Sequence, residues 1–224
     1  MRIRPNFAFE RKLWGRGVTA VAGVDEVGVG AFAGPVIAAA VILDAGTTID
    51  GLADSKLVSP KRREKLFAVI HASAVAIGIG RTEVEEVDRL NIYWAAMEAR
   101  RRAVEALPTK PAHILVDGKR RIVGCNVPQT AVVDGDALSA SIAAASIVAK
   151  VTRDSILQEY AQIYPGYGFE RHKGYGTADH ISALKHLGPL PYHRCSFAPV
   201  RRAGRVQPQL AFWERQPQGK AGTD

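Results

Sequence analysis

The chain is poor in cysteine and has no hydrophobic run long enough to span a membrane. Only Cys125 and Cys195 occur among 224 residues, far apart and outside any CxxC pair. This spacing gives no support to a zinc site and suits the reducing cytoplasm, while a disulfide between the two stays open. The apolar residues 31–43 are too few for a membrane helix, and the first residues carry no signal-peptide core. We therefore expect a cytoplasmic protein that does not enter a membrane.

The chain also has fewer acidic than basic residues. Lysine and arginine total 30 against 22 aspartates and glutamates, which gives a formal net charge of +8. A basic balance favours polyanionic partners, of which nucleic acid is the commonest. The hydrophobic share of 47% and the charged share of 23% are those of an ordinary globular protein that can bury one domain core.

Hydrophobic periodicity predicts alternating strands and helices. Residues 18–27 and 35–43 are expected to be strands, and their connection is too tight for a helical crossover, so they should be antiparallel. Residues 168–176 are expected to form a Gly-rich, basic loop. The other strands are expected at 74–80, 113–118 and 131–133, and the helices at 60–71, from 82, at 91–107, 139–164 and 177–187. This pattern predicts an α/β fold with a mixed sheet.

Two adjacent acids, Asp25 and Glu26, directly follow the apolar run of residues 18–24. A Val-rich run bounded by glycine is typical of a strand that is buried on both faces. Carboxylates in such a place are costly to desolvate unless a partner compensates, and a divalent cation is a suitable partner. The alternative is that Asp25 caps a turn and Glu26 stays solvated.

Asp117 and Asp136 share this placement, since each comes at or just past the end of an expected strand. Strand ends of open α/β sheets gather at one edge, so the four carboxylates would repel one another unless cations lay among them. Two Mg²⁺ or Mn²⁺ ions suit such an oxygen-only set better than zinc does. A pair of ions of this kind activates water and stabilises the leaving oxygen of a phosphodiester. For either acid alone, Asp-Gly turn chemistry is the alternative.

These acids and the residues around them resemble bacterial ribonuclease HII, over about residues 20–200. The number of matches in one order makes coincidence untenable. The matching stretches are 22–28 (AGVDEVG), 33–36 (AGPV), 54–56 (DSK), 115–118 (LVDG), 135–137 (GDA), 141–154 (SIAAASIVAKVTRD), 164–168 (YPGYG), 172–175 (HKGY) and 194–197 (RCSF).

The resemblance implies an RNase H-like fold, with a mixed central sheet flanked by helices and a helical C-terminal part. It implies endonucleolytic cleavage of RNA in RNA–DNA hybrids and incision 5′ to a ribonucleotide embedded in duplex DNA. The reaction implied is two-metal-ion hydrolysis that leaves a 5′-phosphate and a 3′-hydroxyl. The family's metal-binding, catalytic acids fall on Asp25, Glu26, Asp117 and Asp136.

The same resemblance organises the chain into three parts. We expect an N-terminal segment at residues 1–17, the RNase H-like catalytic domain with its helical part at 18–203, and a flexible tail at 204–224. The tail is rich in glutamine, proline and glycine, a composition that does not favour a packed core. The expected partners are RNA–DNA hybrids and ribonucleotide-containing duplex DNA, bound by a monomer.

The loop Gly28-Val29-Gly30 departs from the family, which has arginine at the middle position. In the family this loop inspects the ribose 2′-hydroxyl, the group that distinguishes RNA from DNA. Valine keeps the glycine geometry but cannot donate a charge-assisted hydrogen bond to phosphate. We therefore expect the loop to contact substrate with weaker binding, a lower rate or altered junction specificity. Asp134, where the family has a basic residue, either strengthens cation binding or repels phosphate.

Four further side chains are expected to contact the nucleic acid. By resemblance, Tyr175 stacks near the ribose 2′-hydroxyl, and a tyrosine between glycines on a basic loop suits that contact. Lys173 and His172 beside it, and Lys56 in the DSK stretch, are expected at phosphates. The alternatives are a tyrosine packed on the domain and ordinary surface lysines.

Two other functions are compatible with these features. The first is a hybrid-binding module with little or no catalysis, caused by Val29. The second is a basic scaffold protein whose acids cluster by coincidence. Cleavage of a duplex that contains one ribonucleotide, in the presence of Mg²⁺ or Mn²⁺, separates both from the enzyme.

Overall fold

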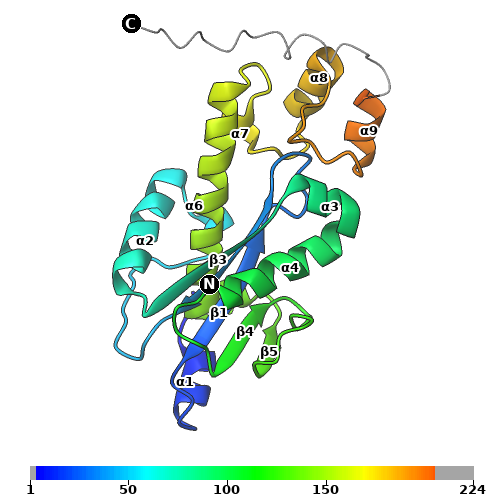
Figure 1. The fold of residues 1–224 in the computed structure, drawn as a ribbon. Helices are drawn as coiled ribbons and strands as arrows, with labels where there is room; N and C mark the ends of the chain where they lie inside the picture. The colour runs from blue at the N-terminus through cyan, green and yellow to red at the C-terminus, as the bar shows by residue number, and fades with distance from the viewer. Residues whose placement is uncertain (1–3, 205–224) are drawn as a thin grey trace, which may run out of the picture.

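The computed structural model describes residues 4–204, and residues 205–224 of the expected tail lie outside the described residues. Within that part of the chain, one five-stranded sheet has the order β3-β2-β1-β4-β5 (Figure 1). The strands are β1 (Val21–Val27), β2 (Val36–Ile42), β3 (Ala76–Thr82), β4 (His113–Asp117) and β5 (Gln129–Val132). The helices are α1 (Ala8–Trp14), η1 (Ser55–Leu57), α2 (Pro60–Ser73), α3 (Val84–Leu90), α4 (Ile92–Glu105), α5 (Gly135–Leu138), α6 (Ala140–Ile163), α7 (Phe169–His172), α8 (Ala178–Leu187) and α9 (Ala198–Gly204).

The sheet is mixed, as the sequence predicts. Strands β1 and β2 are antiparallel, with Asp25 opposite Ala39, and β2 and β3 are antiparallel as well. Strand β4 runs parallel to β1, with Val116 beside Val24, and β5 runs parallel to β4. Strands β1, β4 and β5 therefore end at the same edge of the sheet, which is the edge where the candidate acids lie.

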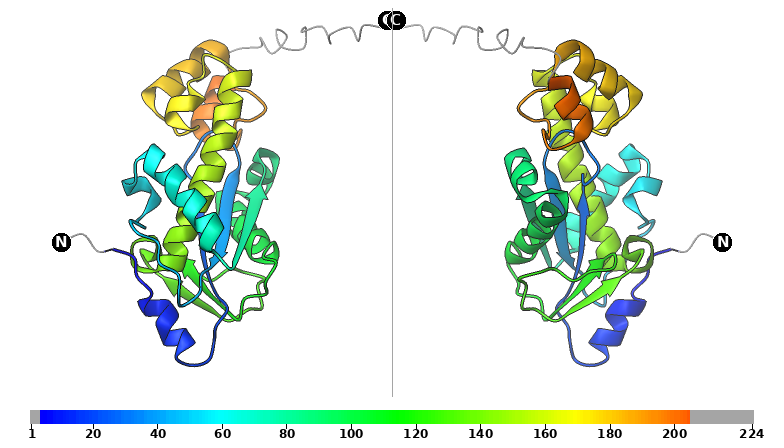
Figure 2. Two further views of the ribbon diagram at one scale, coloured as in Figure 1. Left: turned by 90° about the vertical axis from the view of Figure 1, so that its left-hand side faces the viewer. Right: turned by 90° about the vertical axis from the view of Figure 1, so that its right-hand side faces the viewer.

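Helices cover both faces of the sheet, because side chains along a buried strand alternate between the two faces. Ile37, Ala39 and Val41 of β2 pack with residues of α2 and α6. Ala38 and Ala40 pack with the alanine-rich face of α4 on the opposite side. Figure 2 shows these layers edge-on, with α6 and α2 on one side of the sheet and α4 on the other.

Helix α6 lies unusually close to the sheet. A Cβ atom added at Gly23 of β1 would lie 2.1 Å from the backbone carbon of Ser141, so only glycine fits there. The facing half of α6 consists of small and aliphatic buried residues, from Ala140 to Ala149. Since both partners are small at the crossing, β1 and its acids are fixed against a rigid helix.

The C-terminal helices gather around the far half of α6 (Figure 1). Leu157 and Tyr160 of α6 pack there with Tyr167, Phe169 and Leu190 in a separate apolar cluster. The expectation of a loop over 168–176 is wrong in part, because Phe169–His172 form the helical turn α7. Left-handed residues at both ends limit it to one turn: φ is 79° at Gly168 and 50° at Lys173.

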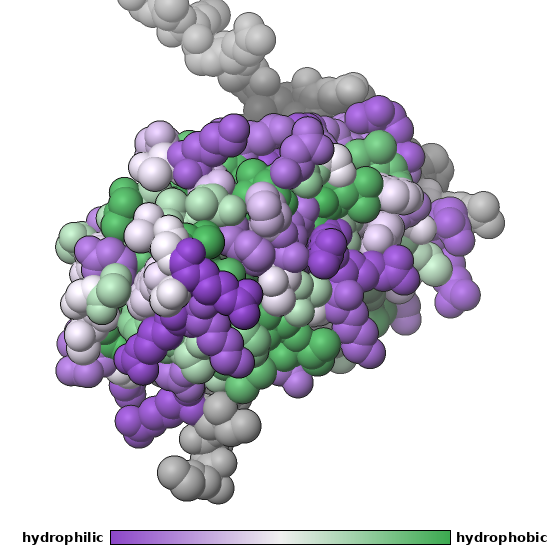
Figure 3. All heavy atoms as spheres, turned by 90° about the horizontal axis from the view of Figure 1, so that it is seen from below, coloured by the Kyte–Doolittle hydropathy of each residue, from purple (hydrophilic) through white to green (hydrophobic). Residues whose placement is uncertain are grey.

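Helix α1 is anchored to the domain by a buried acid. The Glu10 carboxylate accepts hydrogen bonds from the Ser139 hydroxyl at 2.6 Å and the Ser141 amide at 2.9 Å, and Glu10 is fully buried. Seen from the α1 end, hydrophilic and hydrophobic residues are interspersed on the surface (Figure 3). In residues 4–204, none of the helices is both long and apolar enough to cross a lipid bilayer.

Candidate active site at the carboxyl edge of the sheet

The structure brings the four sequence-predicted acids to one edge of the sheet. Asp25 and Glu26 lie near the end of β1, directly before its last residue, Val27. Asp117 is the last residue of β4. Asp136 lies in the short helix α5 that follows β5. The backbone amide of Gly135 donates to Oδ1 of Asp117 at 2.8 Å, so α5 is held against the end of β4.

The electrostatic environment of these acids is poorly compensated. Burial raises the pKa of Asp25 well above its usual range, and the charges of Glu26 and Asp117 raise it further. Hydrogen bonds from the Ser146 hydroxyl and the Glu26 amide lower this pKa, but they do not offset the rise. Burial raises the pKa of Asp136 too, together with the charges of Asp54 and Asp117. Closely spaced carboxylates behave in this way when a counter-charge is missing.

Among residues 4–204, two cationic side chains pair with the acids. Nζ of Lys56 lies 3.7 Å from Oδ2 of Asp136, on a side chain that is 76% exposed. Arg100 of α4 donates from Nε to Oε2 of Glu26 at 2.6 Å, a pairing that the sequence did not predict. Its Nη2 pairs with the same oxygen, and Arg100 is only 7% exposed.

The donor set suits a hard divalent cation, although the acids are not yet arranged as ligands. All four groups offer carboxylate oxygens, which Mg²⁺ and Mn²⁺ prefer. Burial, and then the charges of Glu26 and Asp117, raise the pKa of Asp25, so the charged form of Asp25 is unfavourable without a cation. Within residues 4–204, no three acidic, histidine or cysteine side chains stand together at metal-binding geometry. Glu26 instead directs Oε2 to the guanidinium of Arg100.

The glycine loop runs beside the acids, and its two glycines differ in what they require. Gly28 has φ 94°, and a Cβ there would lie 2.3 Å from Nε of Arg153, so the fold itself requires glycine. A Cβ at Gly30 would meet no atom within 4 Å. Gly30 therefore leaves open space beside Val29, whose side chain is 37% exposed.

Tyr175 is held next to this loop. Its backbone pairs with Ala31 in an isolated antiparallel bridge. The Arg153 guanidinium lies 5.4 Å from the centre of the Tyr175 ring, and Nζ of Lys150 lies 5.8 Å from it. The predicted tyrosine and the predicted glycine loop therefore meet, although they lie far apart in sequence.

Two buried arginines make this meeting possible, and the sequence did not predict their contacts with the backbone. Arg153 donates to the carbonyl oxygens of Pro35 at 3.0 Å, Ala33 at 2.8 Å and Lys173 at 2.8 Å. Arg194 is fully buried as well and donates to carbonyl oxygens of the same loop. The one sequence signal for these contacts is that Arg153 and Arg194 lie in stretches that match the family.

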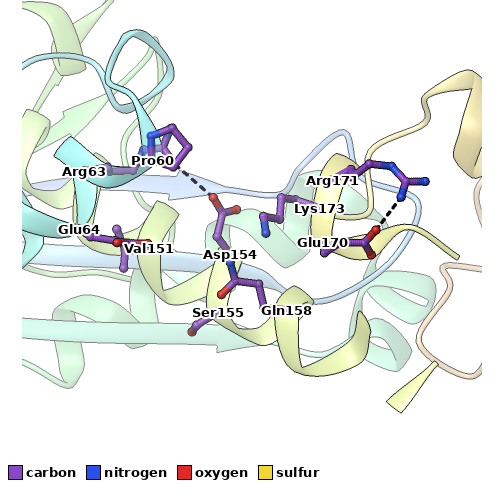
Figure 4. Close-up of a pocket in the computed structure, with 10 residues that line it drawn as sticks. All are labelled: Pro60, Arg63, Glu64, Val151, Asp154, Ser155, Gln158, Glu170, Arg171 and Lys173. Carbon is purple, nitrogen blue, oxygen red and sulfur yellow. Dashed lines mark hydrogen bonds and ion pairs between the residues drawn. The ribbon is translucent and has the colours of Figure 1, made fainter. Parts of the chain in front are cut away.

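Lys173 lies in a different place from the acids. It lines a hollow of about 310 Å³ between α2, α6 and α7, together with Arg63, Asp154 and Glu170 (Figure 4). The ten residues that line this hollow include none of the four acids. The ammonium of Lys56, by contrast, lies beside Asp136, one of the four acids.

The expectation of a phosphate contact for His172 is wrong. This histidine is buried, its Nε2 lies 2.7 Å from the carbonyl oxygen of Tyr167, and its Nδ1 accepts from the Gly174 amide at 3.1 Å. Both ring nitrogens are therefore used within the fold. Asp134, the second departure from the family, is exposed at the start of α5, with φ 54°.

Comparison with known proteins agrees with this arrangement. A family model described as Ribonuclease HII matches residues 22–200. A Ribonuclease HII of Myxococcus xanthus (strain DK1622) is 53% identical over 203 residues, which cover 90% of this chain and 69% of that protein. A Ribonuclease HII of Acidovorax sp. (strain JS42) is 57% identical over 183 residues, covering 82% of this chain and 87% of the relative.

Solved structures share the fold. The ribonuclease H2 of Pyrococcus horikoshii OT3 superposes with a TM-score of 0.67 at 25% identity, covering 83% of this chain and 97% of the other. Bst-RNase HIII, solved in complex with Mn2+, has a TM-score of 0.66 at 19% identity over 87% of this chain and 72% of its own, a likeness of fold alone. The RNase H-like fold is thus confirmed. With a family model that spans both the glycine loop and all four acids, the chain belongs to the ribonuclease HII family, the endoribonucleases that degrade RNA in RNA–DNA hybrids.

Proposed function

We propose that this ribonuclease also incises duplex DNA 5′ to a single embedded ribonucleotide, by hydrolysis that depends on divalent cations. Asp25, Glu26, Asp117 and Asp136 are the proposed catalytic residues and cation ligands. The observation that carries the proposal is the meeting of four carboxylates at one sheet edge, where burial and mutual repulsion raise the pKa of Asp25 and of Asp136. Such a set is unfavourable alone and is stabilised by divalent cations.

Two Mg²⁺ or Mn²⁺ ions are the proposed cofactors, and the Mn²⁺ complex of a ribonuclease HIII with this fold supports them. When bound, the ions supply Lewis acidity to the attacking water and to the leaving 3′ oxygen, so that the products carry a 5′-phosphate and a 3′-hydroxyl. The chain's own part is to fix the acids. Strands β1 and β4 hold Asp25 and Asp117 on neighbouring parallel strands, and the Gly135 amide orients the Asp117 carboxylate.

Recognition of the ribose is proposed for Gly28, Val29, Gly30 and Tyr175. The open space at Gly30 and the bridge between Ala31 and Tyr175 support it, because they bring exposed backbone and a tyrosine to the same loop. A sugar edge that carries a 2′-hydroxyl can be bound by such groups. Val29 offers no donor to a phosphate, so we propose that it attenuates the enzyme.

Phosphate contacts are proposed for Lys56 and Lys173. Lys56 is exposed, and its ammonium lies 3.7 Å from Asp136, which supports a contact with the phosphate at the cleaved bond. Lys173 lies on the far side of α6, in the hollow of Figure 4, where it would contact the backbone some distance from cleavage. Contacts of this kind position a duplex without reading its sequence.

The test is cleavage of an end-labelled duplex that contains one ribonucleotide, with Mg²⁺ or Mn²⁺ added. We expect one product with a 3′-hydroxyl, cut 5′ to the ribonucleotide, and loss of that product in Asp117→Asn. Asp179→Asn, which changes a carboxylate on α8 that is 72% exposed, is the matched control and should cleave normally. If the protein cleaves an RNA–DNA hybrid but not this duplex, the proposed incision at single ribonucleotides is wrong.

A hybrid-binding module with little catalysis is the alternative, and the same experiment separates the two. Binding of hybrid without product at any cation concentration would favour the module. We further propose that the enzyme acts as a monomer in the cytoplasm, where its two cysteines, both free in the structure, stay reduced. Sedimentation at micromolar concentration tests the monomer.

A further inference from the structure

Arg100 belongs to the candidate site, although it lies outside the stretches that resemble the family. It stems from α4, on the face that otherwise packs Ala96, Ala99 and Ala103 onto the sheet. A guanidinium buried among alanines is costly unless an anion compensates it. Glu26 is that anion, and both contacting nitrogens of Arg100 meet one of its oxygens, Oε2.

The two arginines that follow in the sequence have different partners. Arg101 pairs with Glu98 and Glu105 along the helix. Arg102 pairs with Glu86 of α3 at 2.7 Å and with Glu98 at 2.8 Å. In this run of three arginines only Arg100 pairs with one of the four acids. Arg100 is also buried, so it does not serve as an ordinary charged surface residue.

Arg100 also borders space that is open to solvent. Together with Glu26, Val29 and Asp117 it lines a hollow of about 410 Å³. Lys119 and Arg120 lie on the same hollow, and the Arg120 guanidinium is 5.3 Å from the centre of the Tyr93 ring. The hollow thus combines three basic side chains with two of the acids, and basic groups arranged in this way suit a backbone phosphate.

We propose that Arg100 is a positioning residue with two alternative partners: the Glu26 carboxylate in the free protein, and a backbone phosphate of nucleic acid seated in this hollow. As the counter-ion of Glu26, Arg100 weakens the attraction of the acids for a divalent cation. When a phosphate takes over the guanidinium, Glu26 is released to the cation. The inference rests on the proposed cation-binding role of Glu26. It implies that all four acids bind divalent cations only after nucleic acid has bound.

The first measurement is Mn²⁺ binding by isothermal titration calorimetry, without nucleic acid. Arg100→Gln should bind Mn²⁺ about three- to tenfold more tightly than wild type, because a positive charge next to a ligand has been removed. Arg100→Lys keeps the charge and should stay near wild type. Arg102→Gln, in which the changed arginine pairs with Glu86 and Glu98 instead, is the matched control and should also stay near wild type.

The second measurement is the affinity for a fluorescent RNA–DNA hybrid in EDTA, where no cleavage occurs. Arg100→Gln should bind the hybrid about tenfold more weakly and lose about one unit of the salt-dependence slope, as expected for one lost phosphate contact. Tighter cation binding combined with weaker hybrid binding is the signature of the proposal, since damage to the fold would weaken both.

Three outcomes would overturn it: unchanged or weaker Mn²⁺ binding by Arg100→Gln, unchanged hybrid binding, or equal effects in Arg102→Gln. Circular dichroism and thermal melting of each variant check that the fold is intact, and weaker binding of both Mn²⁺ and hybrid by Arg100→Gln would count against the proposal. Wild-type cleavage is assayed separately. If cleavage occurs while these shifts are missing, the role of Arg100 is wrong and the nuclease function stands.

Discussion

The guanidinium of Arg194 donates a hydrogen bond of 2.7 Å to the carbonyl oxygen of Gly28, across 166 positions of the sequence. The same group donates to the carbonyl oxygens of Val29 at 3.1 Å and of Gly34 at 2.8 Å. One buried side chain near the C-terminal end therefore fixes both ends of the loop that is proposed to inspect the ribose. The shape of that loop depends on the C-terminal helices as much as on its own glycines.

Arg194→Met should destabilise the protein by about 2–4 kcal/mol, because it leaves several buried carbonyl oxygens without donors. The free energy of unfolding in urea measures this loss. Arg202→Met, at an exposed position of α9, is the control and should change the value by less than about 0.5 kcal/mol. Equal stability of the two variants would show that Arg194 does not anchor the loop.

Val29→Arg should raise kcat/KM on a duplex with a single ribonucleotide by about tenfold, the worth of one charge-assisted hydrogen bond. Steady-state cleavage at low substrate concentration provides the measurement. Val75→Arg adds the same charge at an exposed valine at the opposite edge of the sheet and should have no such effect. An unchanged kcat/KM in Val29→Arg would mean that valine does not attenuate this enzyme.

Gly30→Ala should fold normally yet cleave poorly. The added methyl group meets no atom of the protein within 4 Å, so the melting temperature should stay within about 2 °C of wild type. The methyl group would fill space that we propose for the ribose, and a displacement of the substrate by about 1 Å can reduce the rate ten- to hundredfold. Full activity of Gly30→Ala would place the substrate elsewhere.

Gly28→Ala is the informative comparison for that variant. Here the added carbon would lie 2.3 Å from Nε of Arg153, and φ is 94°, so the loss should be one of stability. The two neighbouring glycines are thus expected to separate a binding effect from a folding effect. Similar melting temperatures for the two variants would contradict this.

Asp25→Asn should stabilise the cation-free protein by about 1 kcal/mol while it abolishes cleavage. The pKa of Asp25 is raised because its charged form is buried beside Glu26 and Asp117, and a neutral amide removes that repulsion. Thermal melting in EDTA provides the measurement. Added Mg²⁺ should stabilise wild type more than the variant, and a lower melting temperature for the variant in EDTA would contradict the assignment.

The buried histidines of the C-terminal helices should make stability depend on pH. Burial lowers the pKa of His180 to about 4 and that of His193 to about 3, and their Nε2 atoms lie 3.0 Å apart. The unfolded chain takes up these protons near the ordinary value of 6.5, whereas the folded chain does not until its own lower pKa is reached. The unfolded state therefore binds more protons in this window, and stability falls as the pH drops from about 6.5 towards 4.

The slope should approach about 1.4 kcal/mol per pH unit for each histidine. Urea denaturation at several pH values between 7.5 and 4.5 measures it. His180→Gln should show a shallower dependence because one of the buried histidines that titrate is absent. An identical slope in wild type and in this variant would assign the pH dependence to other groups.

The convergence of the acids could be predicted from sequence because it follows from a local rule. Asp25 and Asp117 each lie at the end of a buried strand, and parallel strands end at one edge of a sheet. The role of Arg100 could not be predicted, since in the run Arg100–Arg102 the periodicity of α4 does not tell which arginine meets β1. The roles of Arg153 and Arg194 depend on contacts across more than 100 positions, and no pattern within a short window indicates them.

The same reasoning applies to the elements that the sequence misplaced. The turn α7 is a single helical turn enclosed by left-handed residues, too short for a periodic signal, within a stretch whose glycines indicate a loop. His172 looked like a phosphate ligand because it precedes Lys173, but the turn directs its ring into the core. The sequence shows which side chains have suitable chemistry for binding phosphate. The path of the backbone determines which of them are exposed to bind it.

The bonds from Arg153 and Arg194 to the loop at residues 28–35 have a consequence for the order in which the protein is made. The loop and the first two acids leave the ribosome early, whereas the arginines that shape the loop come from the last third of the chain. Contacts between such distant segments form late, because the intervening chain must first be synthesised and closed. The loop of a nascent chain therefore takes its final shape only after Arg153 and Arg194 have been synthesised, well after Asp25 and Glu26.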